Sequence, residues 1–393
     1  MNNLEQNAKA TLSPPYIPAL LLFAASRALM LVAMAFANRW LPVEPSAGTW
    51  DATTRWFRFL LRYDSGWYLH IAMHGYTYTG NDLEKQTIVF YPLYPALIKA
   101  LTFLGLSHAA SAVIVTNVAI VVAIIVFTKL VAERYDNETA VSAVAFLSFF
   151  PGSLFFSAAY TESLTFLFIV CFFLFLLRKR FVIAACFAGL CFATRSTGLV
   201  LLAPLAWEII RRYWPDQRRR ILLEGSLCML IATAGLWLYM IYLWAAFRAP
   251  FAFMTAMGAW NHDSSFGSPW LLQPVFKAAA DVRYQLQHFI PDPNALAFVL
   301  FVAFAAMVII FRKRMSVSLL LFAAGALLLP YFTRTSGVGF ISFIRYELLM
   351  FPVFIIAATL AKRRVWLGLA ICGISGALLF WYTALFAKWY WVG

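Results

Sequence analysis

Charge is scarce in this sequence, and that scarcity sets the class of protein. Asp, Glu, Lys and Arg make up only 12% of the 393 residues, while 63% are hydrophobic and 38 residues are Phe. Soluble domains have about a quarter of their residues charged, so the composition excludes an ordinary soluble domain. The apolar residues fall into long runs, and a membrane-spanning helix needs about 20 of them. The sequence therefore predicts an all-α polytopic membrane protein.

The chain also lacks several motifs that carry chemistry. All five cysteines lie inside apolar runs and no CxxC occurs, which excludes a disulfide framework and a cysteine-based zinc site. Walker, GxGxxG and GxSxG motifs are missing as well, so neither a cytosolic nucleotide sugar nor a serine hydrolase mechanism is expected. His70 and His74 lie four residues apart without an HExxH motif, so we expect no histidine metal site.

The charges that are present are mostly basic and clustered. The formal net charge is +14, and the basic residues gather between apolar runs. Cytoplasmic loops of membrane proteins have this pattern, so we expect these clusters to be cytoplasmic and exclude nucleic acid as a partner. The clusters are residues 178–180, 211–220, 312–314 and 362–364.

Apolar runs between these clusters predict about eleven transmembrane helices in one domain, residues 1–393. The outer loops are residues 38–109, with interfacial or re-entrant helices, and residues 248–293. Residues 181–210 lie between two basic clusters, so they should form two short helices that meet at Gly198 and carry Arg195 near the outer interface. The predicted spans are residues 16–37, 110–131, 140–156, 163–177, 181–210 as two helices, 221–247, 295–311, 317–332, 341–361 and 366–386.

The apolar run 88–105 has two possible placements. If it crosses the membrane, the loop that bears Asp64 is cytoplasmic and the N-terminus lies outside. If it is a short re-entrant or interfacial helix, that loop lies outside and the N-terminus is cytoplasmic. We predict the second arrangement, because the two Tyr-Pro pairs of FYPLYP suit a helix that starts at the interface.

Asp64, in YDSGWY, is the first of four charged candidates at predicted outer ends of apolar segments. Its functional interpretation is a general base that takes a proton from an acceptor hydroxyl, with Trp67 and Tyr68 one helical turn away. Its structural interpretation is the N-cap of an interfacial helix. Composition alone leaves both open.

Glu162, in AAYTESL, is the second candidate. A carboxylate in the first turn of a helix is favoured by the helix macrodipole, so the residue taken alone is interpreted as structural. Paired with Asp64 on the same membrane face, it becomes a second catalytic carboxylate. Two carboxylates can also bind a divalent cation such as Mg²⁺ or Mn²⁺, so a cofactor of that kind stays open, although we assign no metal ligand.

Arg195 and Arg345 are the cations that we expect to face a cavity. A guanidinium group binds phosphate with two parallel hydrogen bonds, so both are candidates for a phosphate site. Arg345 can alternatively extend to the membrane surface. Arg195 lies within its apolar segment and has less freedom to do so.

Five motifs occur in an order that resembles the PIG-V mannosyltransferase family and its bacterial relatives, which are GT-C glycosyltransferases. The motifs are RYDSGWYLHIAMHGY, FYPLYP, FFPGSLFFSAAYTESL, ATRSTGLVLLAP and FIRYELLMFPVF, and the resemblance as a whole spans about residues 19–352. The resemblance implies an integral membrane enzyme that takes mannose from a polyprenyl-phosphate carrier on the non-cytoplasmic face and inverts the anomeric centre. It also implies that the FYPLYP helix lies on the outer side.

Carried over to this chain, the resemblance makes Asp64 the base and matches Glu162, Arg195 and Arg345 to charged positions of the family. Tyr63 stands where the family usually has Trp, and we expect it to keep an aromatic wall beside Asp64. A lipid phosphate leaves as a stable anion, so cations are needed and a general acid is not. We expect seven further side chains to contact sugar or lipid: Trp67, Tyr68, His74, Tyr91, Tyr94, Tyr160 and Tyr346.

The expected partners are polyprenyl-phosphate mannose as donor, a glycan, lipid or protein hydroxyl as acceptor, and membrane lipids. The compact loops favour a bacterial inner membrane. The alternative function is a transporter or flippase of lipid-linked sugars. A transporter should carry polar residues near the membrane midplane in both halves, whereas the candidates here gather at outer ends.

Overall fold

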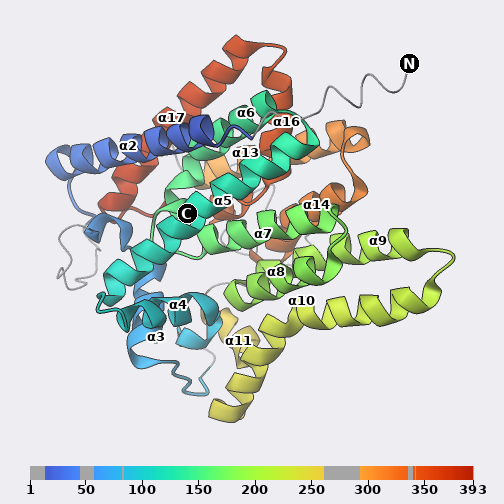
Figure 1. Cartoon of the computed structure of the whole chain (residues 1–393). Coiled ribbons are helices and arrows are strands. Elements are labelled where there is room, and N and C mark those ends of the chain that lie inside the picture. Colours follow the sequence, from blue (N-terminus) through green and yellow to red (C-terminus); the bar gives the residue numbers. More distant parts are fainter. Residues whose placement is uncertain are drawn as a thin grey trace, which may run out of the picture.

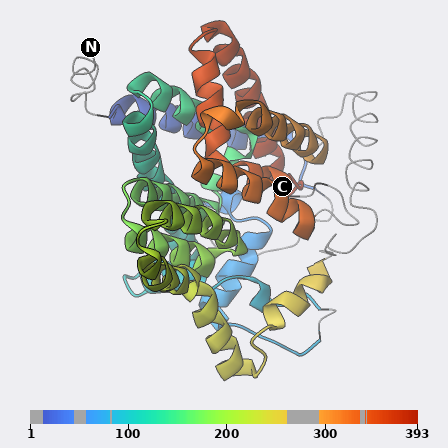
Figure 2. The same cartoon turned by 90° about the vertical axis from the view of Figure 1, so that its right-hand side faces the viewer.

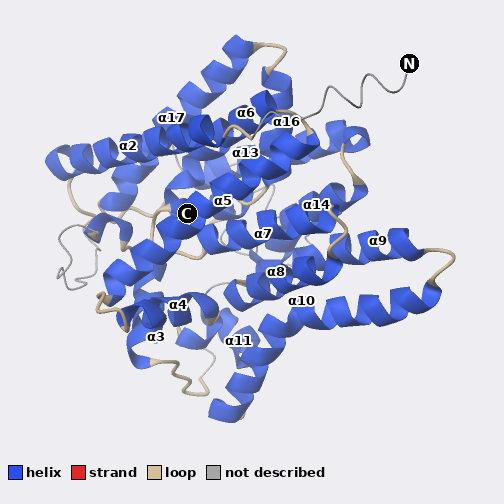
Figure 3. Cartoon of the chain, in the orientation of Figure 1, coloured by secondary structure: helices blue, strands red, loops and turns tan. Residues whose placement is uncertain are grey.

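A computed structural model describes residues 14–44, 57–81, 84–260, 293–334, 340 and 342–392. Within these ranges the chain forms helices, turns and loops, with no strand (Figure 3). The sequence WNHDSSFGSPW and most of the predicted outer loop 248–293 lie outside the described residues.

Among the described residues, five helices are long and apolar enough to cross a membrane. A helix rises 1.5 Å per residue, so 20 residues cover the roughly 30 Å hydrocarbon core. They confirm five of the predicted spans. These helices are α2 (Tyr16–Trp40), α5 (His108–Arg134), α10 (Arg218–Phe247), α13 (Pro293–Phe311) and α17 (Val365–Ala387).

The remaining helices are shorter. Five apolar ones are α4 (Leu93–Thr102), α7 (Glu162–Leu177), α8 (Phe181–Thr194), α14 (Val317–Arg334) and α16 (Phe351–Ala361). The others are α3 (Asp64–His74), α6 (Asn137–Phe149), α9 (Leu202–Tyr213), α11 (Ala252–Thr255) and α15 (Phe343–Glu347). Short 3-10 turns are η1 (Arg58–Leu60), η2 (Thr87–Val89), η3 (Pro151–Phe156), η4 (Ser196–Leu201), η5 (Ala256–Trp260) and η6 (Arg312–Arg314). The number of eleven crossings stays a prediction.

The helices form two groups that lie side by side. In both Figure 1 and Figure 2, α8, α9 and α10 form one side of the bundle, and α2 and α17 lie together on the other side. The helices α5 and α7 pack between these groups. The helices α5 and α7 therefore lie at the centre of the bundle, with the two groups packed on either side of them.

Ion pairs tie several helix ends together at one end of the bundle. Arg178, just after α7, pairs with Glu133 near the end of α5. Glu208 of α9 accepts hydrogen bonds from Lys179 and from Ser318 at the start of α14. The C-terminal ends of α5, α7 and α9 and the start of α14 thus share one end of the bundle.

A second contact extends this end. Lys362, just after α16, lies 2.6 Å from Asp136, the N-cap of α6. Residues from two of the predicted basic clusters, 178–180 and 362–364, therefore join the same end. We call it the basic end. Its composition agrees with the positive-inside pattern.

Residues 181–210 form two helices, as predicted from parity. The break falls at Arg195, which has an extended backbone, rather than at Gly198, which lies inside η4. The chain folds back so tightly that a Cβ on Gly198 would meet the Phe192 ring at 2.7 Å. Glycine is needed here for this close reversal.

Two predicted spans are interrupted in the structure. In residues 140–156, α6 ends at Phe149 and the tighter η3 begins at Pro151, because proline cannot donate the helical hydrogen bond at that point. In residues 341–361, α15 ends at Glu347 and α16 starts at Phe351, one residue before Pro352. The helix α4, with ten residues, is too short for a crossing, as expected for the run 88–105.

The helices α8 and α10 approach each other closely through two glycines. A Cβ on Gly235 would lie 2.2 Å from the carbonyl oxygen of Gly189, and a Cβ on Gly189 would lie 2.6 Å from that of Ile231. Small residues allow this backbone contact between membrane helices, where van der Waals packing drives association.

We expect Gly235→Ala to lower the stability of the protein by about 1–3 kcal/mol, because the added methyl group must push two backbones apart. The measurement is thermal unfolding in detergent. Gly373→Ala is the matched control, because a Cβ at Gly373 of α17 would meet no atom within 4 Å. Equal melting temperatures for both variants would contradict the close contact.

Candidate functional site

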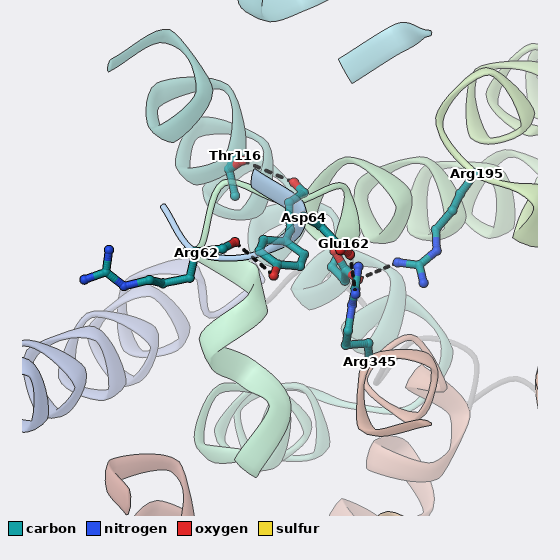
Figure 4. A network of polar contacts seen from close by, with 7 residues as sticks. Arg62, Asp64, Thr116, Glu162, Arg195 and Arg345 are labelled. Carbon is teal, nitrogen blue, oxygen red and sulfur yellow. Dashed lines mark hydrogen bonds and ion pairs between the residues drawn. The ribbon is translucent and has the colours of Figure 1, made fainter. Parts of the chain in front are cut away.

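Two helix starts, one helix break and one short helix bring the four charged candidates into one cluster (Figure 4). Asp64 is the first residue of α3 and Glu162 is the first residue of α7. Arg195 lies between α8 and η4, and Arg345 is the central residue of α15. The helix α7 begins at this cluster and ends at the basic end, so the two lie at opposite ends of that helix.

Arg345 bridges the two carboxylates. Its Nη1 donates to Asp64 Oδ2 at 2.7 Å, and its Nε donates to Glu162 Oε1 at 2.5 Å. The side chain of Glu162 is fully buried, that of Arg345 is 6% exposed, and that of Asp64 is 20% exposed. Asp64 is therefore the carboxylate that a substrate can reach.

Arg195 completes the cluster from the opposite side. It donates to the same oxygen of Glu162 that Arg345 uses. Its guanidinium carbon lies 4.6 Å from the ring centre of Tyr346, and that of Arg345 lies 4.6 Å from the ring centre of Tyr160. Aromatic faces attract desolvated cations. The two guanidinium groups are thus held by carboxylates and by rings at once.

The local sequence explains how Arg345 comes so close to Glu162. In FFPGS, η3 passes beside α15, and a Cβ on Gly152 would lie 2.9 Å from the carbonyl oxygen of Ile344. Only glycine permits this approach without a shift of the backbone. Gly152 thereby sets the position of the helix that carries Arg345.

A family model described as "Mannosyltransferase (PIG-V)" matches residues 20–278 of this chain. The chain belongs to the PIG-V mannosyltransferase family. The match includes Asp64, Glu162 and Arg195, while Arg345 lies beyond its end. As a family member with five long apolar helices and several shorter ones, it is an integral membrane protein.

A curated relative matches part of this chain. The chain is 32% identical over 214 residues to GPI mannosyltransferase 2 of Drosophila pseudoobscura pseudoobscura, over 49% of this chain and 45% of that protein. The chain thus spans less than half the length of this curated relative.

Among solved structures, the chain is similar to the Archaeoglobus fulgidus oligosaccharyltransferase. The form with Zn and sulfate is 17% identical at a TM-score of 0.46, over 93% of this chain and 53% of that one. The apo form is 15% identical at a TM-score of 0.47, over 94% and 56%. Neither likeness decides the fold, since both scores lie below 0.5.

The aromatic residues predicted to contact substrate divide into two groups. Tyr68, Tyr160 and Tyr346 lie at the charged cluster, and all three are buried. Burial raises the pKa of the Tyr68 phenol, and the Asp64 carboxylate raises that pKa further, so this hydroxyl stays protonated. Trp67 is half-buried and stacks on Phe90, with ring centres 5.9 Å apart.

The other predicted contacts lie elsewhere. Tyr94 is fully buried, and its hydroxyl interacts with Thr116 and donates to the carbonyl oxygen of Ala112. Tyr91 packs in a separate aromatic cluster with Tyr239. His74 is exposed at the far end of α3.

Two of these predictions need correction. Tyr94 and Tyr160 have no exposed surface to offer to a sugar. The hydroxyl of Tyr160 donates to the carbonyl oxygen of Arg62 at 3.1 Å, and Thr116 donates to the backbone oxygen of Tyr160 (Figure 4). Both tyrosines thus support the site from within the core.

Arg27 escaped the sequence analysis. It lies in the middle of α2 and donates to the carbonyl oxygens of Ser153 at 2.8 Å and Ser148 at 3.2 Å, where α6 gives way to η3. It thereby satisfies carbonyl groups that the helix break leaves without helical partners. A basic residue inside the first apolar run was the available sign, since an intramembrane charge usually has a role.

We expect Glu162→Gln to destabilise the protein by about 3–5 kcal/mol, because it leaves the buried guanidinium group of Arg195 without a counter-charge and that of Arg345 with Asp64 alone. Thermal unfolding measures the change, with Glu138→Gln, at the exposed start of α6, as the control. The double variant Glu162→Gln/Arg195→Met should recover part of the loss, since one unpaired cation is removed with it. Additive losses would contradict the pairing.

Proposed function

We propose that this chain is an inverting GT-C mannosyltransferase that moves mannose from a polyprenyl-phosphate carrier to a hydroxyl acceptor on the non-cytoplasmic membrane face. The observation that carries the proposal is the buried cluster of Asp64, Glu162, Arg195 and Arg345 in a member of this family. It offers one accessible carboxylate beside two guanidinium groups. These are the groups that sugar transfer from a lipid phosphate needs.

In the proposed reaction, Asp64 accepts the proton of the acceptor hydroxyl as its oxygen attacks the anomeric carbon of mannose. The bond from that carbon to the phosphate oxygen breaks, and its electron pair stays on the phosphate. A single displacement of this kind inverts the anomeric centre. Arg195 and Arg345 hold the phosphate as its charge grows.

The charge of the cluster fits this step. Two carboxylates and two guanidinium groups sum to zero before the reaction. Proton uptake by Asp64 raises that sum to +1 while the leaving phosphate gains one negative charge. The cluster thus becomes more attractive to the phosphate as the transition state develops, which is the condition for lowering the barrier.

Glu162 takes a different role from the one expected. It is fully buried and bound by both Arg195 and Arg345. We therefore treat it as a positioning residue that fixes the spacing of the two guanidinium groups, and not as a second acid or base.

The basic end supports the membrane side of the proposal. If that end is cytoplasmic, α7 runs from the outer face inward and places Glu162 outside. We propose a bacterial inner membrane with the site facing the periplasm, a cytoplasmic N-terminus and about eleven crossings. The acceptor is a hydroxyl of a glycan, lipid or protein.

The decisive experiment is transfer of radiolabelled mannose from synthetic polyprenyl-phosphate mannose by the purified protein in lipid, with a membrane lipid extract as acceptor. We expect Asp64→Asn to lower the rate by about 10²–10⁴-fold, the usual contribution of a general base. Asp216→Asn, in an exposed loop between α9 and α10, should match the wild type.

Three outcomes would count against the proposal. Equal rates for Asp64→Asn and the wild type would remove Asp64 as the base. Faster transfer from a polyprenyl-phosphate carrier of another sugar would remove mannose as the donor. Movement of the polyprenyl-phosphate carrier across vesicle membranes without any transfer of mannose would favour the transporter.

A chelator should leave the transfer rate unchanged. Arg345 stands between Asp64 and Glu162, where a divalent cation shared by two carboxylates would bind, and it already supplies the positive charge. In the described residues no group of three potential metal-ligating side chains occurs. The measurement compares rates in EDTA, Mg²⁺ and Mn²⁺, and a loss of activity in EDTA that Mn²⁺ restores would refute this assignment.

A further inference from the structure

The residue before Asp64 adopts a costly backbone conformation. Tyr63 has φ +49° and ψ −113°, a region that a residue with a Cβ rarely occupies. Such a conformation persists only when the surroundings enforce it. Because Tyr63 is directly followed by the first residue of α3, its backbone angles set the direction in which Asp64 enters the site.

The surroundings that enforce it come from the far end of the described chain. The hydroxyl of Tyr63 donates to the carbonyl oxygen of Trp389. Its ring packs against Phe386, Trp389 and Trp391, with ring centres 6.0, 5.4 and 4.8 Å away. We call residues 386–391 the aromatic clamp. Tyr63 therefore points to the clamp and does not form the aromatic wall expected beside Asp64.

Arg62 makes a second connection to the clamp. Its Nη2 donates to the carbonyl oxygen of Ala387 at 3.0 Å, and its guanidinium carbon lies 4.5 Å from the ring centre of Trp389. Figure 4 shows this side chain directed away from Asp64, Glu162 and Arg345. Arg62 is thus a cation near the site that does not serve the phosphate.

The backbone of the same two residues faces the site. The carbonyl oxygen of Arg62 accepts from the hydroxyl of Tyr160 and from the amide of Ser65, and the carbonyl oxygen of Tyr63 accepts from the amide of Gly66. The clamp thus holds the side chains of Arg62 and Tyr63, while α3 and Tyr160 hold the carbonyl groups of the same two residues. These contacts fix the backbone that leads into Asp64.

We propose that the aromatic clamp is a positioning element that keeps Tyr63 in its strained conformation and so aims Asp64 at Arg345 and the acceptor. The inference rests on the proposed function, because Asp64 is the base there. The family match ends at residue 278, so the clamp lies outside it. Tyr63, Arg62, Trp389 and Trp391 act through Asp64 and do not touch the substrate.

The first test compares Tyr63→Gly with Tyr63→Ala in the transfer assay. Both lose the ring and the hydroxyl, but glycine adopts a positive φ without the penalty of a Cβ. We expect Tyr63→Ala to lower kcat by about tenfold or more with an unchanged donor KM, and Tyr63→Gly to keep clearly more activity. Packing alone predicts equal losses or a larger loss for glycine, and that result would overturn the proposal.

The second test removes the clamp and leaves Tyr63 intact. The double variant Trp389→Ala/Trp391→Ala should lower kcat, and adding Tyr63→Gly to it should restore part of the rate. Trp366→Ala is the control, because Trp366 is 66% exposed at the start of α17, whereas the clamp lies at the end of that helix and just after it. An unchanged kcat in the double variant would overturn the clamp.

Hydrogen exchange separates this inference from the proposed function. In the double variant the amides of Ser65 and Gly66 should exchange faster than in the wild type, and in Trp366→Ala they should not. This result together with a wild type that transfers no mannose would retain the clamp and reject the function. Unchanged exchange in the double variant would reject the clamp, whatever the activity. If the double variant unfolds, Tyr63→Phe replaces it in both measurements, because it removes only the hydrogen bond to Trp389. A Tyr63→Phe protein with the exchange rates and the kcat of the wild type would then overturn the proposal.

Discussion

The structure depends on one carboxylate that two buried guanidinium groups share. An isolated charge in a low-dielectric interior costs many kcal/mol, and Glu162 supplies the counter-charge of Arg195 and one of the two counter-charges of Arg345. The pairing joins segments from the middle and the end of the chain. It leaves Asp64, bound to one of the two cations, as the member with exposed surface.

Broken helices make this arrangement possible. A continuous helix satisfies its own backbone and presents side chains to neighbours only along its length. Here α6, α8 and the predicted span 341–361 each stop short at the charged cluster or next to it. The carbonyl groups freed at one break are taken up by Arg27, and Gly152 allows another break to come close. The irregular backbone is thus buried in protein.

Much of this could be predicted from the sequence, for identifiable reasons. Hydropathy located the long helices, because about 20 apolar residues in a row have few alternatives. The spacing of basic clusters required two helices in residues 181–210, although the break falls at Arg195 and not at Gly198, and the four charged residues stood out against an apolar background. Their mutual pairing could not be predicted, because it depends on how α7 and α15 pack, and no local pattern encodes that distance.

The errors have one physical cause. Tyr63 was expected to form an aromatic wall beside Asp64 and Tyr94 to contact the substrate, because aromatic residues near a charged site often line it, yet each hydroxyl binds a more distant segment. Arg27 was overlooked because its partners are backbone carbonyl groups, which carry no sequence signature. Hydropathy indicates which residues avoid water, but it does not reveal what each one contacts.

The two ends of the bundle also differ in how they should respond to ionic strength. At the basic end, the ion pairs involve exposed side chains, such as Arg178 and Glu133, 37% and 38% exposed. Dissolved salt weakens exposed ion pairs of this kind. The pairs of Glu162 lie out of reach of ions. A salty medium would therefore loosen the loops at the basic end and leave the charge geometry around Asp64 as it is.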